Sequence, residues 1–144
     1  MSELDLKIFI GMHRSINRLD QNTARLAQTK QLTLSQFAVL EALYSKGAMS
    51  VGTLRDRILS TAGTIPVIVT NLERRGYVQR CPHEKDRRIC IVRLTEAGRR
   101  IIQEILPQNL SMIEERFSVF TRAEKEQLLA YMKKLGGSID EKNH

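Results

Sequence analysis

The chain has 144 residues, of which 42% are hydrophobic, and its 23 Lys and Arg stand against 16 Asp and Glu. That length suffices for one ordinary domain with its own core, and the composition excludes a wholly disordered chain. No apolar run approaches the ~20 residues that a membrane span needs, and the N-terminus lacks the pattern of an export signal. The sequence therefore predicts a cytoplasmic protein with no membrane partner.

The excess positive charge lies in the middle third of the chain. Residues 50–100 carry eleven basic and five acidic side chains, a net charge of +6, whereas residues 1–49 carry +2 and residues 101–144 carry −1. Ten of those eleven cations are arginine, the residue favoured for multidentate contact with phosphate and guanine. A basic run alone often marks only a solvent-exposed face. Whether this one indicates contact with nucleic acid depends on the secondary structure of the same segment.

A long first helix is predicted over residues 4–30, because apolar side chains recur there at alternating spacings of three and four. Such a helix would span about 40 Å, which is long for a domain of this size, and a helix that outruns its own core usually packs against another chain. The residues of the stripe are Phe9, Met12, Ile16, Leu19, Thr23 and Leu26.

Two shorter helices are predicted next. Thr33 and Gln36 have the spacing of a capping box that begins the second helix, and Gly47 is placed to end it. Ser50 is placed to cap a third helix over residues 51–58.

A fourth helix is predicted from a cap at Ser60 or Thr61 to about residue 75, where Gly76 ends it. Pro66 would lie about five positions inside this helix, so a mild bend is expected. Its predicted inward stripe consists of Ile65, Ile68, Val69 and Leu72.

The period then changes from helical to extended. Residues 77–81 and 89–94 are β-rich and flank a charged stretch, which predicts a hairpin with a charged tip. Three short helices followed by a hairpin are typical of a winged helix-turn-helix, here over residues 33–95.

Two further helices complete the predicted fold. Thr95 is placed to cap a helix over residues 96–118 that Pro107 should kink, and Thr121 and Glu124 form a second capping box before the last helix. The predicted inward stripe of the first of these consists of Ala97, Ile101, Ile105, Ile113 and Phe117. The fold class is thus mainly α with a small β-hairpin wing and six helices.

The fourth helix is the candidate recognition helix, whose N-terminal half enters the major groove. Thr70 and Asn71 offer hydrogen-bonding groups to bases, whereas Val67 and the Thr64 methyl suit thymine methyls. The charged hairpin tip suits the narrower minor groove, where arginine is attracted by the negative potential. The predicted DNA-contacting residues are Thr61, Gly63, Thr64, Val67, Thr70, Asn71, Arg74, Arg75, Lys85, Asp86, Arg87 and Arg88.

The wing region resembles that of the MarR family of transcription regulators. Asp86 and Arg88, followed by Leu94, Thr95 and Gly98, are similar to the family pattern D-x-R before L-T-x-x-G. The resemblance implies that Arg88 enters the minor groove and that Asp86 holds its guanidinium in position.

The resemblance extends over almost the whole chain. Residues 72–80 resemble the family's link from recognition helix to wing, and residues 33–40 are similar to the opening of its second helix. The family implies an intertwined, obligate homodimer in which residues 1–32 and 96–144 form the helical dimerisation region. Two recognition helices would then bind a pseudo-palindromic operator whose half-sites lie about 34–36 Å apart.

Within that family the chain is most similar to the MhqR-type subgroup of catechol- and quinone-responsive repressors. The likeness rests on Phe37, the run from Leu40 to Leu43, Lys46 and Gly47, and on the run from Ile105 to Pro107. It implies a repressor released by a small phenolic, quinone-like or electrophilic effector. In MarR-like proteins a crevice holds such an effector, and the candidate lining here, each member of which also fits ordinary core, is Phe9, Met12, His13, Phe37 and Tyr44.

The cysteines offer a second route to sensing. Cys90 alternates with Val92 and should face the core, whereas Cys81 should lie on the opposite face near Arg80 and Arg88. Neighbouring cations favour the reactive thiolate, which makes Cys81 a candidate redox sensor; a plain surface thiol is the alternative.

Other chemistry is not supported by any motif. The three histidines lack ligand spacing with one another or with the cysteines, so no metal is predicted, and no cofactor loop or catalytic constellation is present. The sequence therefore predicts a sequence-specific DNA-binding regulator rather than an enzyme. The alternative is an architectural protein that coats DNA without sequence preference.

Overall fold

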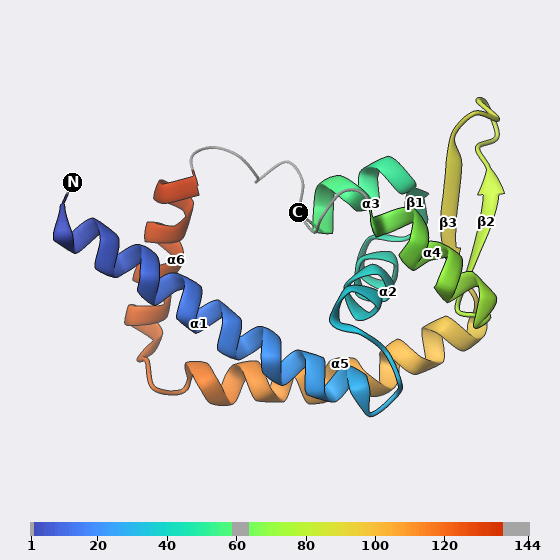
Figure 1. The fold of residues 1–144 in the computed structure, drawn as a ribbon. Coiled ribbons are helices and arrows are strands. Elements are labelled where there is room, and N and C mark those ends of the chain that lie inside the picture. Colours follow the sequence, from blue (N-terminus) through green and yellow to red (C-terminus); the bar gives the residue numbers. More distant parts are fainter. Residues whose placement is uncertain (1, 59–63, 137–144) are drawn as a thin grey trace. The chain divides into compact units, whose positions relative to one another are not determined.

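The computed structural model describes residues 2–58 and 64–136. Within these ranges lie helices α1 (Glu3–Gln28), α2 (Leu34–Lys46), α3 (Val51–Ile58), α4 (Ile65–Arg74), α5 (Glu96–Phe117) and α6 (Arg122–Gly136). The strands are β1 (Met49–Ser50), β2 (Val78–Pro82) and β3 (Cys90–Leu94), as Figure 1 shows. The predicted fold class, six helices with a small hairpin wing, is confirmed.

Reciprocal caps begin two of these helices as predicted. At α2, the Thr33 backbone N–H donates to Gln36 Oε1 (2.9 Å) and the Gln36 N–H donates to Thr33 Oγ1 (3.1 Å). At α6, the Thr121 N–H donates to Glu124 Oε1 (2.9 Å) and the Glu124 N–H to Thr121 Oγ1 (3.2 Å). Each pair satisfies two backbone donors that a helix start otherwise leaves without partners.

The start of α4 differs from the prediction. Ser60 and Thr61, the predicted caps, lie outside the described residues. The helix begins at Ile65, so Pro66 falls in its first turn rather than five positions inside. A proline there removes no intrahelical hydrogen bond, so the predicted bend was wrong. Gly76, at φ +82°, follows the end of α4 as predicted.

The hairpin belongs to a small antiparallel sheet with strand order β1-β3-β2 among the described residues. Strand β1 was not predicted, because two residues show no periodicity; it pairs Met49 with Val92. In the register of β2 and β3, Arg80 opposes Val92 and Cys81 opposes Ile91. Since successive side chains alternate between faces, Arg80 and Cys81 lie on opposite faces of the sheet.

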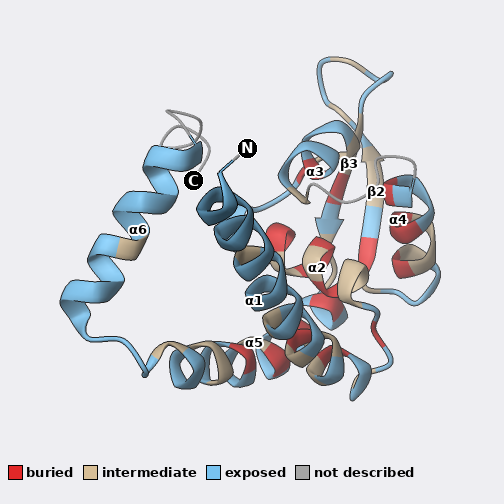
Figure 2. Cartoon of the chain, turned by 60° about the vertical axis from the view of Figure 1, so that its left-hand side comes forward, coloured by how far each residue is buried: buried red, intermediate tan, exposed pale blue. Residues whose placement is uncertain are grey.

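The buried core lies between α2, α3, α4 and the sheet (Figure 2). All four residues of the predicted α4 stripe are buried. The predicted α5 stripe was partly wrong: Ala97 is exposed, and Ile102 and Gly98 are buried instead, together with the correctly predicted Ile105. Ala27 of α1 also joins this core, so the buried cluster extends beyond residues 33–95 on both sides.

The backbone divides into two compact units, Met1–Asn109 and Leu110–His144. The first holds the buried core and the wing. In the second, α6 has no buried residue, and Leu129, Met132 and Leu135 are exposed on it. Among the helices described, none has the length and apolar character to cross a membrane.

Candidate nucleic-acid interface

The end of α4, the start of the wing and the start of α5 meet at Thr95. Its hydroxyl donates to the Gly76 carbonyl (2.5 Å), and its backbone N–H donates to the Tyr77 carbonyl (3.1 Å). The Gly98 N–H in turn donates to Thr95 Oγ1 (3.1 Å), which caps α5. A Cβ on Gly98 would overlap the Tyr77 carbonyl, so only glycine permits this approach. The L-T-x-x-G motif therefore connects the end of α4 to the start of α5.

The outward face of α4 presents several of the predicted DNA-contacting side chains. Val67 is 59% exposed, and Thr64 and Arg74 are exposed as well. Asn71 is half-buried on the same helix. Thr61 and Gly63, also predicted for this face, lie outside the described residues.

Thr70, predicted to contact bases, already has hydrogen-bond partners within the protein. Its hydroxyl donates to the Pro66 carbonyl (2.9 Å) and accepts from Arg80 Nη2 (2.8 Å). A hydroxyl has one donor and two acceptor sites, so only one acceptor site remains for another partner.

Arg80 joins β2 to α4 and was not among the predicted site residues. Nη2 donates to the Pro66 carbonyl (2.9 Å) as well as to Thr70, and Nη1 lies 3.6 Å from Glu73 Oε1. The Arg80 backbone N–H donates to Glu73 Oε2 (2.8 Å). The motif that contains Arg80 was recognised in the sequence, but the contacts across the helix and the strand depend on tertiary packing.

Arg75, predicted to contact DNA, holds the other end of α4. Its Nη1 donates to the Gln31 carbonyl (2.6 Å) and its Nη2 to the Lys30 carbonyl (3.2 Å). Its guanidinium carbon lies 5.0 Å from the centroid of the Tyr77 ring. These contacts tie α4 to the turn that follows α1, and we assign Arg75 a structural role.

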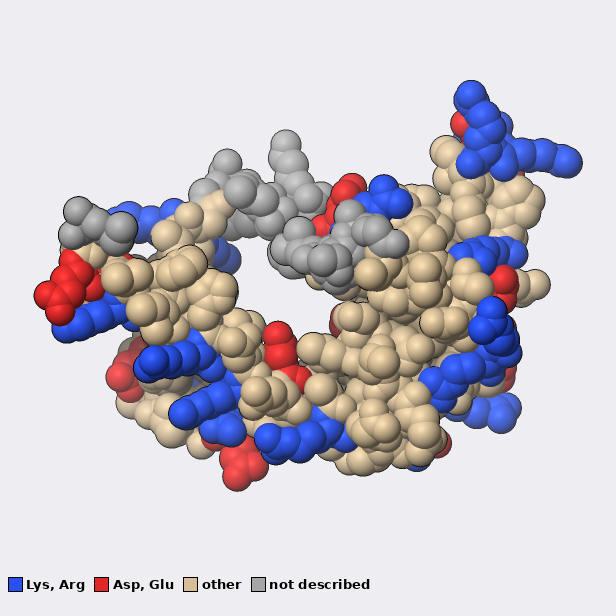
Figure 3. Space-filling view, viewed as in Figure 1, with Lys and Arg blue, Asp and Glu red and all other residues tan. Residues whose placement is uncertain are grey.

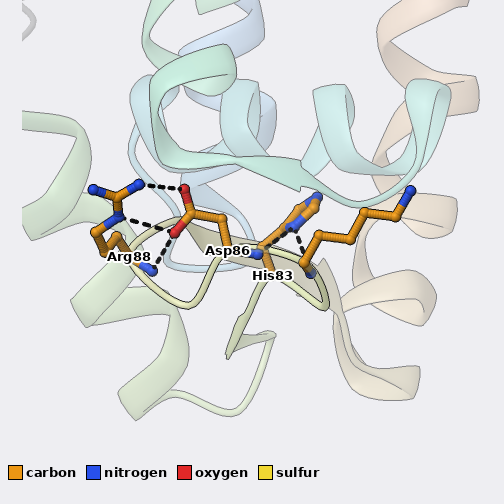
Figure 4. A network of polar contacts seen from close by, with 4 residues as sticks. His83, Asp86 and Arg88 are labelled. Carbon is orange, nitrogen blue, oxygen red and sulfur yellow. Dashed lines mark hydrogen bonds and ion pairs between the residues drawn. The ribbon is translucent and has the colours of Figure 1, made fainter.

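The wing tip is organised by His83 and Asp86 (Figure 4). Asp86 accepts a two-point pair from Arg88, with Nε to Oδ1 at 3.1 Å and Nη2 to Oδ2 at 3.2 Å, and Oδ1 also accepts the Arg88 backbone N–H (3.1 Å). His83 Nδ1 accepts the backbone N–H groups of Lys85 (3.1 Å) and Asp86 (3.2 Å). The expectation that Asp86 positions the Arg88 guanidinium agrees with this geometry.

The tip is strongly basic and open to solvent. Lys85, Arg87 and Arg88 are all exposed, with the Arg88 side chain at 91%, and Figure 3 shows the cations gathered at the end of the hairpin. The hydrogen bonds from the Arg88 side chain and backbone, with a smaller electrostatic contribution from His83, hold the pKa of Asp86 below its ordinary value. Because Asp86 is ionised, the pair keeps its two charge-assisted hydrogen bonds at neutral pH.

The surroundings of Cys81 differ from those expected. Arg80 is directed to the opposite face of the sheet by its contacts with Glu73 and Thr70, and the Arg88 guanidinium is paired with Asp86. Cys81 and Cys90 are both half-buried and unbonded. The two cations expected to activate Cys81 are thus engaged elsewhere.

The predicted effector-lining residues differ in burial and in their local contacts. Phe37 belongs to the buried core, and Tyr44 is half-buried with Arg99 over its ring at 5.7 Å. Phe9 and His13 are exposed on α1 and stack edge-to-face on each other, with ring centroids 4.5 Å apart. Met12 is half-buried beside them.

Comparison with known proteins agrees with the geometry. The model of the MarR family matches residues 32–90. The HTH-type transcriptional regulator MhqR of Bacillus subtilis is 31% identical over 136 residues, which cover 94% of this chain and 94% of MhqR. The transcriptional repressor MprA of Escherichia coli is 26% identical over 127 residues, covering 87% of this chain and 72% of MprA.

The fold is likewise similar to solved structures. The crystal structure of the transcriptional regulator BldR from Sulfolobus solfataricus has a TM-score of 0.81 at 27% sequence identity, covering 96% of this chain and 100% of that one. With a near full-length relative above 30% identity and a matching winged fold, the chain belongs to the MarR family of DNA-binding transcriptional regulators.

Proposed function

We propose that this regulator is a dimeric repressor that binds a pseudo-palindromic operator, with α4 in the major groove and Arg88 in the minor groove. The observation that carries the proposal is the two-point Asp86–Arg88 pair, which fixes an exposed guanidinium at the end of the wing. A guanidinium fixed in advance loses little side-chain entropy when it enters a groove.

The exposed residues divide by the contact they are placed to make. On α4, Val67 and Arg74 are exposed and Asn71 is half-buried, and all three are suited to base edges. Lys85 and Arg87 on the wing are suited to phosphates, which provide affinity without sequence preference. Arg75 is left out of the interface because two backbone carbonyls hold its guanidinium.

A second copy accounts for the exposed apolar residues of the long helices. On α1, Leu4, Phe9 and Ile16 are at least half exposed, and α6 has no buried residue. Helices with such faces are usually covered by another chain. Two chains related by a twofold axis would then place two α4 helices on half-sites about 34–36 Å apart.

We further propose repression, released by a small phenolic, quinone-like or electrophilic effector. The similarity to MprA, a repressor, supports the assignment of repression. The resemblance of the sequence to the quinone-responsive subgroup supports the class of effector. An effector acts only if it binds more tightly to the conformer that fits DNA poorly, because equal affinity for both conformers shifts nothing.

The test begins with DNA selected by the protein from a random pool, with and without catechols and quinones. On the selected operator, Arg88→Ala should weaken binding by about tenfold or more, and on random duplex by much less. Arg87→Ala is the matched control on the same wing tip: it should weaken binding to both duplexes alike.

Two outcomes would contradict the proposal. If selection yields no preferred sequence, the protein coats DNA as an architectural protein. If Arg88→Ala weakens binding to the operator and to random duplex equally, Arg88 has no part in specificity.

A further inference from the structure

We propose that Arg80 is a positioning residue that sets sequence preference by fixing α4 against the wing, without contacting DNA. The inference rests on the proposed function and goes beyond it, because Arg80 is not part of the interface described above. The starting observation is that Arg80 belongs to the basic segment, yet its guanidinium is directed onto α4 rather than toward solvent.

The guanidinium of Arg80 contacts three groups of one helix. Nη2 donates to the Pro66 carbonyl and to Thr70 Oγ1 at 2.9 and 2.8 Å, and Nη1 faces Glu73 Oε1 at 3.6 Å. Pro66 lies in the first turn of α4 and Glu73 near its end, so one side chain contacts most of the helix length. Both rotation and translation of α4 relative to β2 would break at least one of these contacts.

The same contacts determine how Thr70 meets DNA. With its donor on Pro66 and one acceptor site on Arg80, the Thr70 hydroxyl is held in one orientation. Arg80 thereby fixes the direction of the remaining acceptor site on Thr70 Oγ1. That direction determines which donor group on a base edge can form a hydrogen bond with Thr70.

Charge and burial argue against a phosphate contact by Arg80. Its side chain is 30% exposed, whereas that of Arg88 at the wing tip is 91% exposed. Its charge is paired with Glu73, which also accepts the Arg80 backbone N–H at 2.8 Å. A guanidinium engaged in this way releases no phosphate counterions on binding, and this separates positioning from direct contact in an experiment.

The experiment measures affinity for the selected operator and for random duplex across a salt series, using the full chain. Arg80→Ala should lower the operator-to-random ratio by about tenfold while leaving the slope of log K against log salt unchanged. Arg87→Ala is the control with the opposite signature: its slope should fall in magnitude by about one, and its ratio should be unchanged.

Two further variants test the role of the fork-shaped guanidinium. Arg80→Lys keeps the charge but lacks the planar guanidinium that reaches three acceptors at once. Its operator-to-random affinity ratio should therefore fall as it does in Arg80→Ala. Thr70→Val removes the hydroxyl at similar size. Adding Arg80→Lys to Thr70→Val should cost less than the sum of the two separate losses, because both changes break one network.

The outcomes separate this inference from the proposed function. If the wild-type ratio is near one, the proposed function fails. If the wild type is selective but folded Arg80→Ala or Arg80→Lys keeps the wild-type operator-to-random ratio, Arg80 is not a positioning residue. The same conclusion follows if the slope of log K against log salt falls in magnitude in these variants. Circular dichroism checks folding, and if Arg80→Ala does not fold, Arg80→Lys and its combination with Thr70→Val decide the question.

Discussion

At the scale of single residues, arginines that look alike in the sequence have different surroundings. Arg88 is exposed and paired with Asp86, Arg80 is directed onto α4, and Arg75 donates to the turn after α1. Composition predicted a basic DNA-facing segment, but it does not separate cations that meet DNA from cations that hold the protein together. That separation depends on which backbone carbonyls and side chains lie within reach after folding.

The Asp86–Arg88 pair makes a prediction about protonation. Hydrogen bonds from Arg88 favour the carboxylate, so they lower the pKa of Asp86. Their contribution is present above the ordinary pKa of an aspartate and is lost as the pH falls through the lowered value. Arg88→Ala should therefore raise the pKa of Asp86 toward its ordinary value, as measured by ¹³C NMR of the carboxyl group during an acid titration.

Part of the lowering should survive in that variant, because an alanine at position 88 keeps the backbone N–H that donates to Asp86 Oδ1, and because His83 also lowers the pKa of Asp86 electrostatically. Arg87→Ala is the control: it removes a neighbouring cation that makes none of these hydrogen bonds and should leave the titration close to that of the wild type. An unchanged pKa in Arg88→Ala would show that the pair does not form in solution.

At the scale of elements, the sequence predicted features that depend on local hydrogen bonds. The capping boxes at Thr33 and Thr121 and the hairpin were all correct, because the interacting residues are close neighbours along the chain. The errors lie where tertiary contacts decide: the pairing of β1 with β3, and the phase of the buried face of α5. At the site, the wing was predicted, and the Arg80 network was not.

The phase of α5 is set by Gly98, which faces the Tyr77 carbonyl where a β-carbon does not fit. A backbone carbonyl cannot move aside cheaply, so Gly98→Ala should destabilise the protein by about 1–3 kcal/mol, measured by urea unfolding. Gly52→Ala in α3 is the control: among the described residues, its new Cβ would meet Ser50 Oγ alone, at an ordinary 3.9 Å. The control should be neutral or more stable by about 0.5–1 kcal/mol.

Operator binding by Gly98→Ala and Gly52→Ala tests the contacts at Thr95 that connect the end of α4 to the start of α5. If Gly98→Ala displaces the start of α5 from the end of α4, the operator affinity of the folded protein should fall together with its stability. Wild-type stability in Gly98→Ala would contradict the close approach of α5 to the wing.

At the scale of the whole molecule, exposed apolar surface is the feature a single chain does not explain. Isolated exposed leucines are normal in soluble proteins, but α6 has no buried residue, and over the first twenty residues of α1 none is buried either. In proteins, most of the stability of a helix comes from the packing of its apolar face. A second copy of the chain would supply that packing.

The dimer is tested with Leu129→Glu combined with Leu135→Glu, which places two charges on the exposed apolar side of α6. In the wild type, sedimentation equilibrium should give twice the chain mass, and the Tm should rise with protein concentration. The double variant should sediment as a monomer and should bind the operator more weakly, because two half-sites then have to be bound independently.

Val67→Glu is the matched control, since Val67 is an equally exposed apolar residue on α4. It should remain a dimer of wild-type Tm yet lose operator binding, because its carboxylate would face the bases and phosphates of the major groove. If the wild type sediments as a monomer at tens of micromolar, or if the double variant remains a dimer, the apolar face of α6 does not mediate self-association. In that case a single α4 and a single wing would have to bind the operator alone.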